Sequence, residues 1–587
     1  MESAICEMYV EDAEPELTHQ LALTLGLTLR AFMNRKVTRQ RKQSKKYLNT
    51  LRFCSYTSNL KVTGMSADLA LINGNIITMD YLRPKAQAVA IQKNRIVKVG
   101  STEEIKVLVT KKTKVVDLHG KTVVPGFTDS HIHVADFGKF LNWINLTDTI
   151  SIKELQKRLK KRVQKVPKNR WIVGNGWNET RFAEKVYPSR YDLDAVSPDN
   201  PVVLYHECGR VCVVNSKALE IAKVTKETEV PPGGEIQKDS HTSEVTGILR
   251  ESATDLVWKA IPEPTEYEIL ESTSLAFEQV VAAGITTVHW IVASLEEALI
   301  VQKLDAQNRL PLRIHVIVPA KDLDRVDELN FDSTKIDKQL GVKVFVDGSL
   351  AARTAALSEP YMDDNTTTGE LLYSEEELDK VVVKAHKANL QLVMHAMGDK
   401  GIEMALDAVE KVLTKVPRQD HCYRIEHASV LTPDLIKRIK KMGMTISVQP
   451  KCVITEFTDW SAIERLGNKR ARWLYPLKTL INNGIRVVGG SDCPMEPLSP
   501  LAGIQAAVER QYFPEEQITA TEALRMYTVD TAGVSCDQEN KGSIEEAKLA
   551  DFTVLSRDPT ATSTDKIGNI EVLMTVVDGQ IVFQKSV

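Results

Sequence analysis

The sequence lacks features that would direct the chain into a membrane or onto a polyanion. Its apolar patch around residues 21–29 is too short and too rich in threonine to span a bilayer. The formal net charge is only −3 at pH 7, which gives no overall field for nucleic acid or acidic lipid. We therefore expect neither nucleic acid nor a membrane as a partner.

Closely spaced cysteine pairs are also lacking. The chain has eight cysteines but no CxxC pair and no dense framework: Cys6, Cys54, Cys208, Cys212, Cys422, Cys452, Cys493 and Cys536. This usage is typical of reduced thiols in a cytosol and predicts a cytoplasmic protein. Cys208 and Cys212 are two thiols without further ligands nearby, so we interpret them as small buried apolar residues rather than a metal site.

The first 64 residues differ from the rest of the chain. An acidic opening precedes the apolar patch, and a basic run between Arg35 and Lys46 follows it. A signal peptide has the opposite order, and a transit peptide avoids acidic residues, so neither class fits. We expect folded sequence to begin near Met65 and interpret residues 1–64 as an atypical leader that is disordered or not native. The basic run is interpreted as a solvated face.

Both ends of the remaining chain have the pattern of short β-strands. Alternating apolar residues and turn signals such as Asn73-Gly74-Asn75 fill the segment after Asp68, and Asp578-Gly579 marks a similar turn near the C-terminus. With 587 residues, 43% of them hydrophobic, the chain is long enough to bury a large core. We predict that residues 67–124 and 541–587 together form one composite β-sandwich.

Between these ends the pattern changes to alternating helices and strands. Thr265 with Glu268, and Ser374 with Glu377, have the spacing of capping boxes before helical apolar repeats, and Gly284 suits a left-handed helix cap. Eight strands are expected: Thr122–Phe127 running on into the next histidines, Ile285–His289, Leu312–Val318, Val342–Val346, Leu390–His395, Tyr423–His427, Met444–Val448 and Ile485–Gly489. Eightfold parallel alternation predicts a (β/α)8 TIM barrel over residues 125–540, an α/β fold with its functional groups at the C-terminal strand ends.

The tripeptide His131-Ile132-His133 is the first candidate functional motif. Side chains on a strand alternate faces, so both imidazoles can point into a barrel mouth while Ile132 packs outward. One such pair is weak evidence, because two histidines are more often solvated or capped than metal ligands. Further donors at other strand ends are needed.

Four further donors fall at the ends of, or within, later predicted strands. They are Lys343, His395, His427 and Asp492. Each has an ordinary structural alternative, such as a core histidine, a turn or cap aspartate, or a surface lysine. Four imidazoles and a carboxylate at separate barrel ends instead predict a site for a divalent metal of the zinc type.

Several motifs in order resemble the metal-dependent amidohydrolase superfamily, specifically amidohydrolase family 3. The resemblance covers residues 67–587 and rests on Pro125-Gly126-Phe127-Thr128-Asp129-Ser130-His131-Ile132-His133, Gly174-Asn175-Gly176-Trp177, Val214-Asn215-Ser216-Lys217-Ala218-Leu219, Lys343-Val344-Phe345-Val346-Asp347-Gly348-Ser349, His395-Ala396-Met397-Gly398-Asp399, Arg424-Ile425-Glu426-His427-Ala428 and Gly490-Ser491-Asp492-Cys493-Pro494. It implies that the split β-domain flanks the barrel and that an insertion of about residues 140–262, after the first barrel strand, covers the mouth.

The resemblance also implies a role for Lys343. In related two-metal enzymes a lysine in this context is carboxylated and bridges the metals. The expectation is one ion on His131 and His133 with Asp492 beside it, a second on His395 and His427, and N6-carboxylated Lys343 between them. A single zinc ion with an unmodified lysine is the alternative.

The predicted activity is metal-dependent hydrolysis of a non-peptide carbon–nitrogen bond in a small molecule, such as an amide, an N-formyl group or a cyclic amide. Metal-activated water would attack the carbon, with Asp492 as the base. A heterocycle deaminase and a non-catalytic scaffold stay open as alternatives, as does a homo-oligomer.

Substrate contacts depend on loops and are less constrained. Candidates are Trp177, Tyr205, Asn215, Asp347 and Arg353, each of which could equally support the lid or the rim. The sequence departs from the family pattern at Arg210, where histidine is common, and at Trp290, where an acid is common. These departures are expected to enlarge or recharge the pocket.

Overall fold

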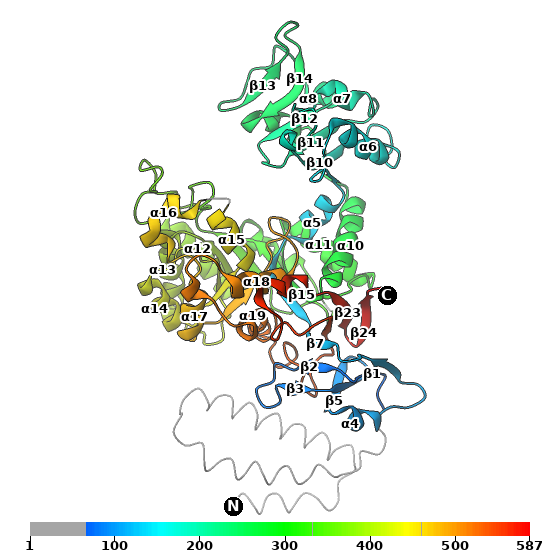
Figure 1. Ribbon diagram of the computed structural model, residues 1–587. Coiled ribbons are helices and arrows are strands. Elements are labelled where there is room, and N and C mark those ends of the chain that lie inside the picture. The colour runs from blue at the N-terminus through cyan, green and yellow to red at the C-terminus, as the bar shows by residue number, and fades with distance from the viewer. Residues whose placement is uncertain (1–65, 332, 459–460, 587) are drawn as a thin grey trace, which may run out of the picture. The chain divides into compact units, whose positions relative to one another are not determined.

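A computed structural model describes residues 66–586 apart from 332, 459 and 460 (Figure 1). The expected leader, residues 1–64, lies outside the described residues. Within this part of the chain, no helix is both long enough and apolar enough to cross a membrane.

Eight parallel strands form the central barrel. Their order around the sheet follows the chain: β8 (Phe127–Ile132), β15 (Ile285–Ile291), β16 (Arg313–Pro319), β17 (Gly341–Phe345), β18 (Gln391–Ala396), β19 (Arg424–His427), β20 (Thr445–Val448) and β21 (Val487–Gly489). The first and last strands meet where Ile132 bridges in parallel to Cys493. The predicted TIM barrel is therefore confirmed, and the carboxyl ends of all eight strands lie at one rim.

Helices follow the strands as βα units require. The barrel helices are α5 (Val134–Leu141), α10 (Glu266–Ala282), α11 (Leu295–Ala306), α12 (Glu375–Lys387), α13 (Asp399–Lys415), α14 (Pro433–Met442), α15 (Pro450–Thr458), α16 (Ala462–Ala471), α17 (Leu477–Asn482), α18 (Pro500–Glu509), α19 (Ala520–Met526) and α20 (Val529–Ala532), with 3-10 helices η4 (Ala320–Glu328) and η5 (Pro514–Glu516). The capping boxes of Thr265 and Ser374 are present at α10 and α12, and Gly284 has the left-handed φ of +83°.

The first predicted strand is in fact two strands. The chain forms β7 (Thr122–Pro125) in a flanking sheet and, after Gly126, β8 in the barrel. Both stretches are buried along their whole length, so hydrophobicity does not reveal the change of sheet. The turn between them places the β-domain directly before the strand that carries His131.

Two sheets flank the barrel, and the larger one combines strands from both ends of the chain. The smaller contains β1 (Leu69–Ile72), β4 (Ala88–Gln92), β5 (Arg95–Gly100) and β6 (Lys114–Asp117), with α4 (Thr102–Lys106); the larger contains β2 (Asn75–Ile77), β3 (Lys85–Ala86), β7, β22 (Phe552–Leu555), β23 (Val572–Val577) and β24 (Gln580–Gln584), with η6 (Thr564–Asn569). β22 pairs antiparallel with β7, matching Phe552 to Pro125. This pairing across the whole chain makes the predicted β-domain composite.

The insertion between β8 and β15 has its own six-stranded sheet. Its elements are β9 (Ile144–Asn145), α6 (Ile152–Val163), β10 (Ile172–Trp177), η2 (Glu179–Arg181), α7 (Arg190–Asp194), β11 (Val202–His206), β12 (Val211–Val214), α8 (Ser216–Ala222), β13 (Glu235–Lys238), β14 (Val245–Arg250), η3 (Glu251–Thr254) and α9 (Asp255–Trp258). Buried side chains line both faces of this sheet. That this insertion covers the barrel mouth stays a prediction.

Two expectations about the cysteines are wrong. Cys422 and Cys536 form a disulfide, although they are 114 residues apart in the sequence. The fold brings the segment before β19 next to the segment after α20, a proximity that no local spacing could indicate. Of the two cysteines expected to be buried, Cys212 is a buried free thiol, but Cys208 is exposed because it lies in the turn between β11 and β12.

Candidate metal centre

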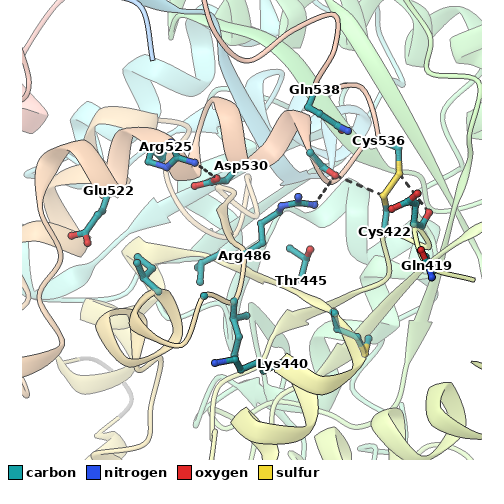
Figure 2. Close-up of a pocket in the computed structure, with 18 residues that line it drawn as sticks. Gln419, Cys422, Lys440, Thr445, Arg486, Glu522, Arg525, Asp530, Cys536 and Gln538 are labelled. Carbon is teal, nitrogen blue, oxygen red and sulfur yellow. Dashed lines mark hydrogen bonds and ion pairs between the residues drawn. A yellow bond between two sulfur atoms is a disulfide. The ribbon is translucent and has the colours of Figure 1, made fainter. Parts of the chain in front are cut away.

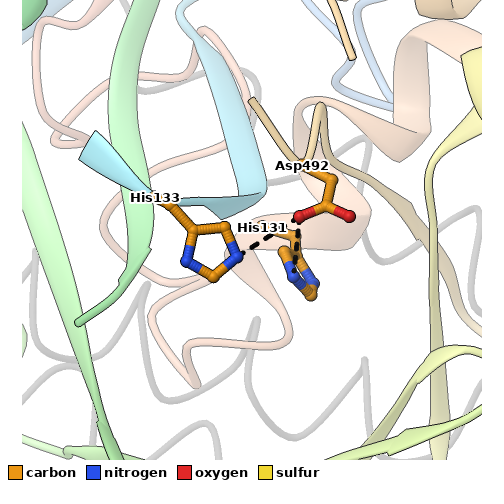
Figure 3. Close-up of side chains that lie close together, drawn as sticks. All are labelled: His131, His133 and Asp492. Carbon is orange, nitrogen blue, oxygen red and sulfur yellow. Dashed lines mark ion pairs between the residues drawn. The ribbon is translucent and has the colours of Figure 1, made fainter. Parts of the chain in front are cut away.

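His131, His133 and Asp492 form a compact donor group at the rim where the carboxyl ends of the strands meet (Figure 3). Asp492 Oδ1 lies 3.4 Å from His131 Nε2 and 3.3 Å from His133 Nε2. One ligand atom from each residue lies within 4.8 Å of the other two. A single cation could contact all three.

The backbone explains why these three residues meet. His131 lies within β8, whereas His133 follows the strand and is the N-cap of α5. The Asp492 amide donates a hydrogen bond to the His131 carbonyl oxygen (2.7 Å), and the His133 amide donates to the Cys493 carbonyl oxygen (3.0 Å). Closure of the barrel between its first and last strands therefore sets the positions of all three donors.

Electrostatics keep Asp492 ionised. Burial alone would raise its pKa, but His131 and a hydrogen bond from His133 outweigh burial and hold the pKa well below the usual carboxyl value. Asp492 is therefore a carboxylate at neutral pH, ready to accept a proton or bind a cation.

His427 lies next to His131, and His395 lies next to His427. Their ring centroids are 4.5 Å apart, and the His427 ring is 5.0 Å from that of His131. Burial lowers the pKa of His131 to about 4 and that of His427 to about 3, and it places the pKa of His395 well below its usual value. All three rings are neutral at pH 7, the form that can ligate a metal.

Hydrogen bonds on one nitrogen of each ring leave the other nitrogen free. His427 Nδ1 donates to Gln449 Oε1 (2.7 Å), and His395 Nε2 donates to the Gly348 carbonyl oxygen (2.9 Å). The buried His395 Nδ1 then has a lone pair and no hydrogen-bond partner. The compact group of His131, His133 and Asp492 does not include His395, but its nitrogen and oxygen donors, like the unpartnered His395 Nδ1, are of the type that a divalent metal such as zinc binds.

Lys343 projects from β17 into the same group and is only 2% exposed. Its Nζ lies 3.5 Å from His131 Nε2. Burial lowers the pKa of Lys343 to about 8, against the opposing effect of the negative charges on Glu426 and Asp492. A buried amine with this pKa has a neutral fraction at physiological pH, which an amine needs in order to react with carbon dioxide.

Glu426 is a functional residue that the sequence analysis assigned no role. It accepts a hydrogen bond from His131 Nδ1, and its Oε1 forms an ion pair with Arg424 Nε (2.7 Å). Burial would raise its pKa, but Arg424 and His131 hold it well below the usual value. The ionised carboxylate fixes the His131 ring with Nε2 directed at the donor group.

Asp129 supports the same histidine through the backbone. Its Oδ1 accepts hydrogen bonds from the amides of His131 (3.1 Å) and Ser491 (2.9 Å). A sequence signal existed for both acids: Arg424 and Glu426 are separated by one residue on a buried strand, and Asp129 stands in the same relation to His131. Such spacing places charged side chains on one inward face.

The expected substrate contacts are engaged elsewhere. Asp347 is buried and accepts hydrogen bonds from the amides of Ala356, Met397 and Gly398 (2.8–3.0 Å). Arg353 pairs with Asp363 at 2.6 Å. These contacts order the loops after β17 and β18, and the assignment of both residues to substrate stays a prediction.

Trp177, Tyr205 and Asn215 belong to the insertion. Trp177 is fully buried and donates to the Leu204 carbonyl oxygen (2.9 Å), whereas Asn215 caps α8. Tyr205 packs against the rings of Trp143 and Trp258. The structure thus gives each of them an internal contact, and their roles toward substrate also stay predictions.

The two departures from the family pattern contact other residues of their own surroundings. Trp290 follows the inward-facing His289, packs against Phe277 of α10 and donates to Glu297 of α11 (2.7 Å), so its ring faces the helix layer. It cannot enlarge the mouth as expected. Arg210 lies on the surface of the insertion, 3.8 Å from Glu251.

The chain is similar in sequence and in structure to known proteins. The amidohydrolase family model matches residues 114–583. YtcJ of Bacillus subtilis (strain 168) is 36% identical over 87% of this chain and 99% of its own length. N-substituted formamide deformylase of Arthrobacter pascens is 30% identical over 88% of this chain and 99% of its own length.

A solved structure shares the fold. An uncharacterized metal-dependent hydrolase from Pyrococcus furiosus is 33% identical, with a TM-score of 0.71 over 84% of this chain and 99% of that one. The segment that the family model matches, residues 114–583, includes the barrel and all six candidate donors. The chain belongs to the amidohydrolase family, as its motifs predict.

Proposed function

We propose that this protein hydrolyses a non-peptide carbon–nitrogen bond of a small molecule, such as an amide, an N-formyl group or a cyclic amide, with Asp492 as the base. The observation that carries the proposal is the position of the ionised Asp492 carboxylate between His131 and His133, 3.4 and 3.3 Å from their Nε2 atoms. The deformylase among the relatives acts on an N-substituted formamide by its name, which supports this bond class.

The residues divide between holding metal and moving a proton. His131, His133 and Asp492 would hold one divalent ion, His395 and His427 a second, and a carboxylated Lys343 would lie between them. When bound, such an ion lowers the pKa of water and polarises a carbonyl group. Zinc fits the nitrogen-rich donor set.

Asp492 would carry the proton. Its carboxylate accepts a hydrogen bond from the attacking water, takes the proton as the carbon becomes tetrahedral, and gives it to the leaving nitrogen. Its low pKa ensures that it starts ionised. The small-molecule substrate, the cytoplasmic location and a homo-oligomer belong to the same proposal.

Reconstitution with zinc or manganese and a panel of amides tests the function. Metal-loaded protein should release an amine together with a carboxylate or formate, and chelated protein should not. Asp492→Asn should still bind metal while its turnover falls about 10²- to 10⁴-fold, the usual contribution of a general base. Near-normal turnover in Asp492→Asn would rule out this base, and ammonia release from aminated rings would instead favour a deaminase.

Lys343 has an independent test. After incubation with ¹³C-bicarbonate, metal-loaded wild type should show a carbamate carbon signal that is missing in Lys343→Arg. One metal per chain and no carbamate signal would favour the single-ion arrangement.

A further inference from the structure

The Cys422–Cys536 disulfide lies at the barrel end opposite the candidate metal centre. Cys422 precedes β19 by two positions, so it lies at the amino-terminal rim of the parallel strands. Both cysteines line a cavity of about 670 Å³ in this rim (Figure 2). Cys536 is exposed, and Cys422 is half-buried. A small thiol reductant can therefore reach the bond.

The two disulfide-bonded residues have unusual backbone conformations. Both cysteines adopt the left-handed region, with φ of 52° at Cys422 and 54° at Cys536. For non-glycine residues this region costs energy and persists where the surroundings impose it. Breaking the bond would free both residues to relax and the two segments to separate.

Gln391 connects these two segments to the barrel interior. Its Nε2 donates to the carbonyl oxygens of Cys422 and Val534, both at 2.7 Å. Its Oε1 accepts from His315 Nε2 (3.1 Å), and the residue is fully buried. The two hydrogen bonds that the Gln391 side-chain amide donates therefore go to the two segments that the disulfide joins.

Buried polar side chains continue from Gln391 toward the metal centre. The ring of His315 lies 4.8 Å from that of His289, whose Nδ1 accepts from Arg424 Nη1 (2.8 Å). Arg424 pairs with Glu426, which contacts His131. None of these residues is more than 1% exposed. We call this path the buried column; its members are Gln391, His315, His289, Arg424, Glu426 and His131.

We propose that the Cys422–Cys536 disulfide is a reversible redox site and that its reduction by a dithiol weakens metal binding at the opposite rim through the buried column. The dithiol supplies two electrons and two protons: the protein S–S bond breaks, two protein thiols form, and the reductant becomes a disulfide. In this view Gln391 is a positioning residue, because it acts on His131 only through other side chains. The metal-binding part of the inference rests on the proposed function.

Hydrogen exchange and metal affinity test the coupling in the full chain. Differential alkylation first establishes that Cys422 and Cys536 are joined in oxidised protein and free after phosphine reduction. Reduction should then speed amide exchange in the peptide that covers β8. Zinc affinity is measured on Cys422→Ser/Cys536→Ser, which needs no reductant that could itself bind zinc, and it should be about 10-fold weaker, the scale of a lost outer-shell contact.

Gln391→Met separates coupling through the column from general loosening. It should weaken zinc binding by a similar factor alone and add little to the double serine variant, because both changes act on one path. Cys208→Ser, an exposed free cysteine of the insertion, is the matched control and should change nothing.

Two results would overturn the redox coupling itself. One is the absence of the bond in oxidised protein, and the other is unchanged β8 exchange after verified reduction of folded wild type. The hydrogen-exchange measurement tests the coupling without metal. If neither wild type nor any variant binds metal, that result refutes the proposed function and not the coupling. Full additivity of Gln391→Met and the serine pair would also exclude the column as the path.

Discussion

Glu426→Gln tests the electrostatic support of the metal centre most directly. The substitution keeps the side-chain volume and removes one charge from a carboxylate that pairs with Arg424 and receives a hydrogen bond from His131. Both charged residues are 0% exposed. Arg424 would therefore be left as a buried cation without a counter-charge.

The expected cost follows from the geometry. At 2.7 Å and an effective dielectric of about 20, the attraction between the two charges is about 6 kcal/mol. Desolvation offsets part of this attraction, and the loss of one partner of a buried pair typically costs about 3–5 kcal/mol. We expect Glu426→Gln to lower the free energy of unfolding by that amount and to weaken zinc binding by about 10- to 100-fold.

Urea unfolding followed by circular dichroism gives the first quantity, and competition with a chelator gives the second. Arg424→Met provides the matched variant: because Arg424→Met/Glu426→Gln removes both charges, it should cost clearly less than the sum of the single changes. A loss of stability below about 0.5 kcal/mol in Glu426→Gln, or strictly additive costs, would refute the reasoning.

Three further predictions concern other parts of the barrel. Asp347→Ala should cost several kcal/mol in urea unfolding, since it leaves three amides unpaired at about 1–3 kcal/mol each, whereas Asp347→Asn keeps one acceptor and should cost less. Burial raises the pKa of Glu456 to about 7, so this group should reduce wild-type stability as the pH rises from about 4.5 to 7. The melting temperature of Glu456→Gln should lack that part of the decline. Parallel curves of melting temperature against pH for the two proteins would contradict this prediction. A Cβ at Gly138 would lie 2.3 Å from the Ser272 carbonyl oxygen, so Gly138→Ala should force α5 from α10 and cost about 1–3 kcal/mol, while an unchanged melting temperature would show that the crossing can adjust.

The barrel could be predicted from the sequence because local signals agreed with one another. Capping boxes at Thr265 and Ser374 mark helix starts, and apolar runs mark the strands between helices. The sequence did not show to which sheet each strand belongs. β7 and β8 are both fully buried, so only three-dimensional pairing shows that the chain changes sheets at Gly126.

The metal ligands were predictable as residue types at strand ends. For the supporting acids Asp129 and Glu426, the alternate spacing indicated an inward-facing side chain but not the partner that each one contacts. Glu426 directly precedes His427, and a search for strand-end donors overlooks a side chain that acts from inside the strand. The disulfide shows the same limit at longer range, since its cysteines are 114 positions apart and no local pattern links them. Side-chain partners that the closed barrel creates cannot be read from spacing.

The donor group itself depends on places where regular strand geometry ends. His427 and Asp492 have positive φ values of 65° and 57°, and His133 is a helix N-cap. Strand alternation therefore does not place these three side chains. The hydrogen bonds Asp492 N to His131 O and His133 N to Cys493 O both close the barrel and bring His131, His133 and Asp492 together. Closure of the barrel and assembly of the site are consequently one structural event, so any change that opens the seam between β8 and β21 should also separate the ligands.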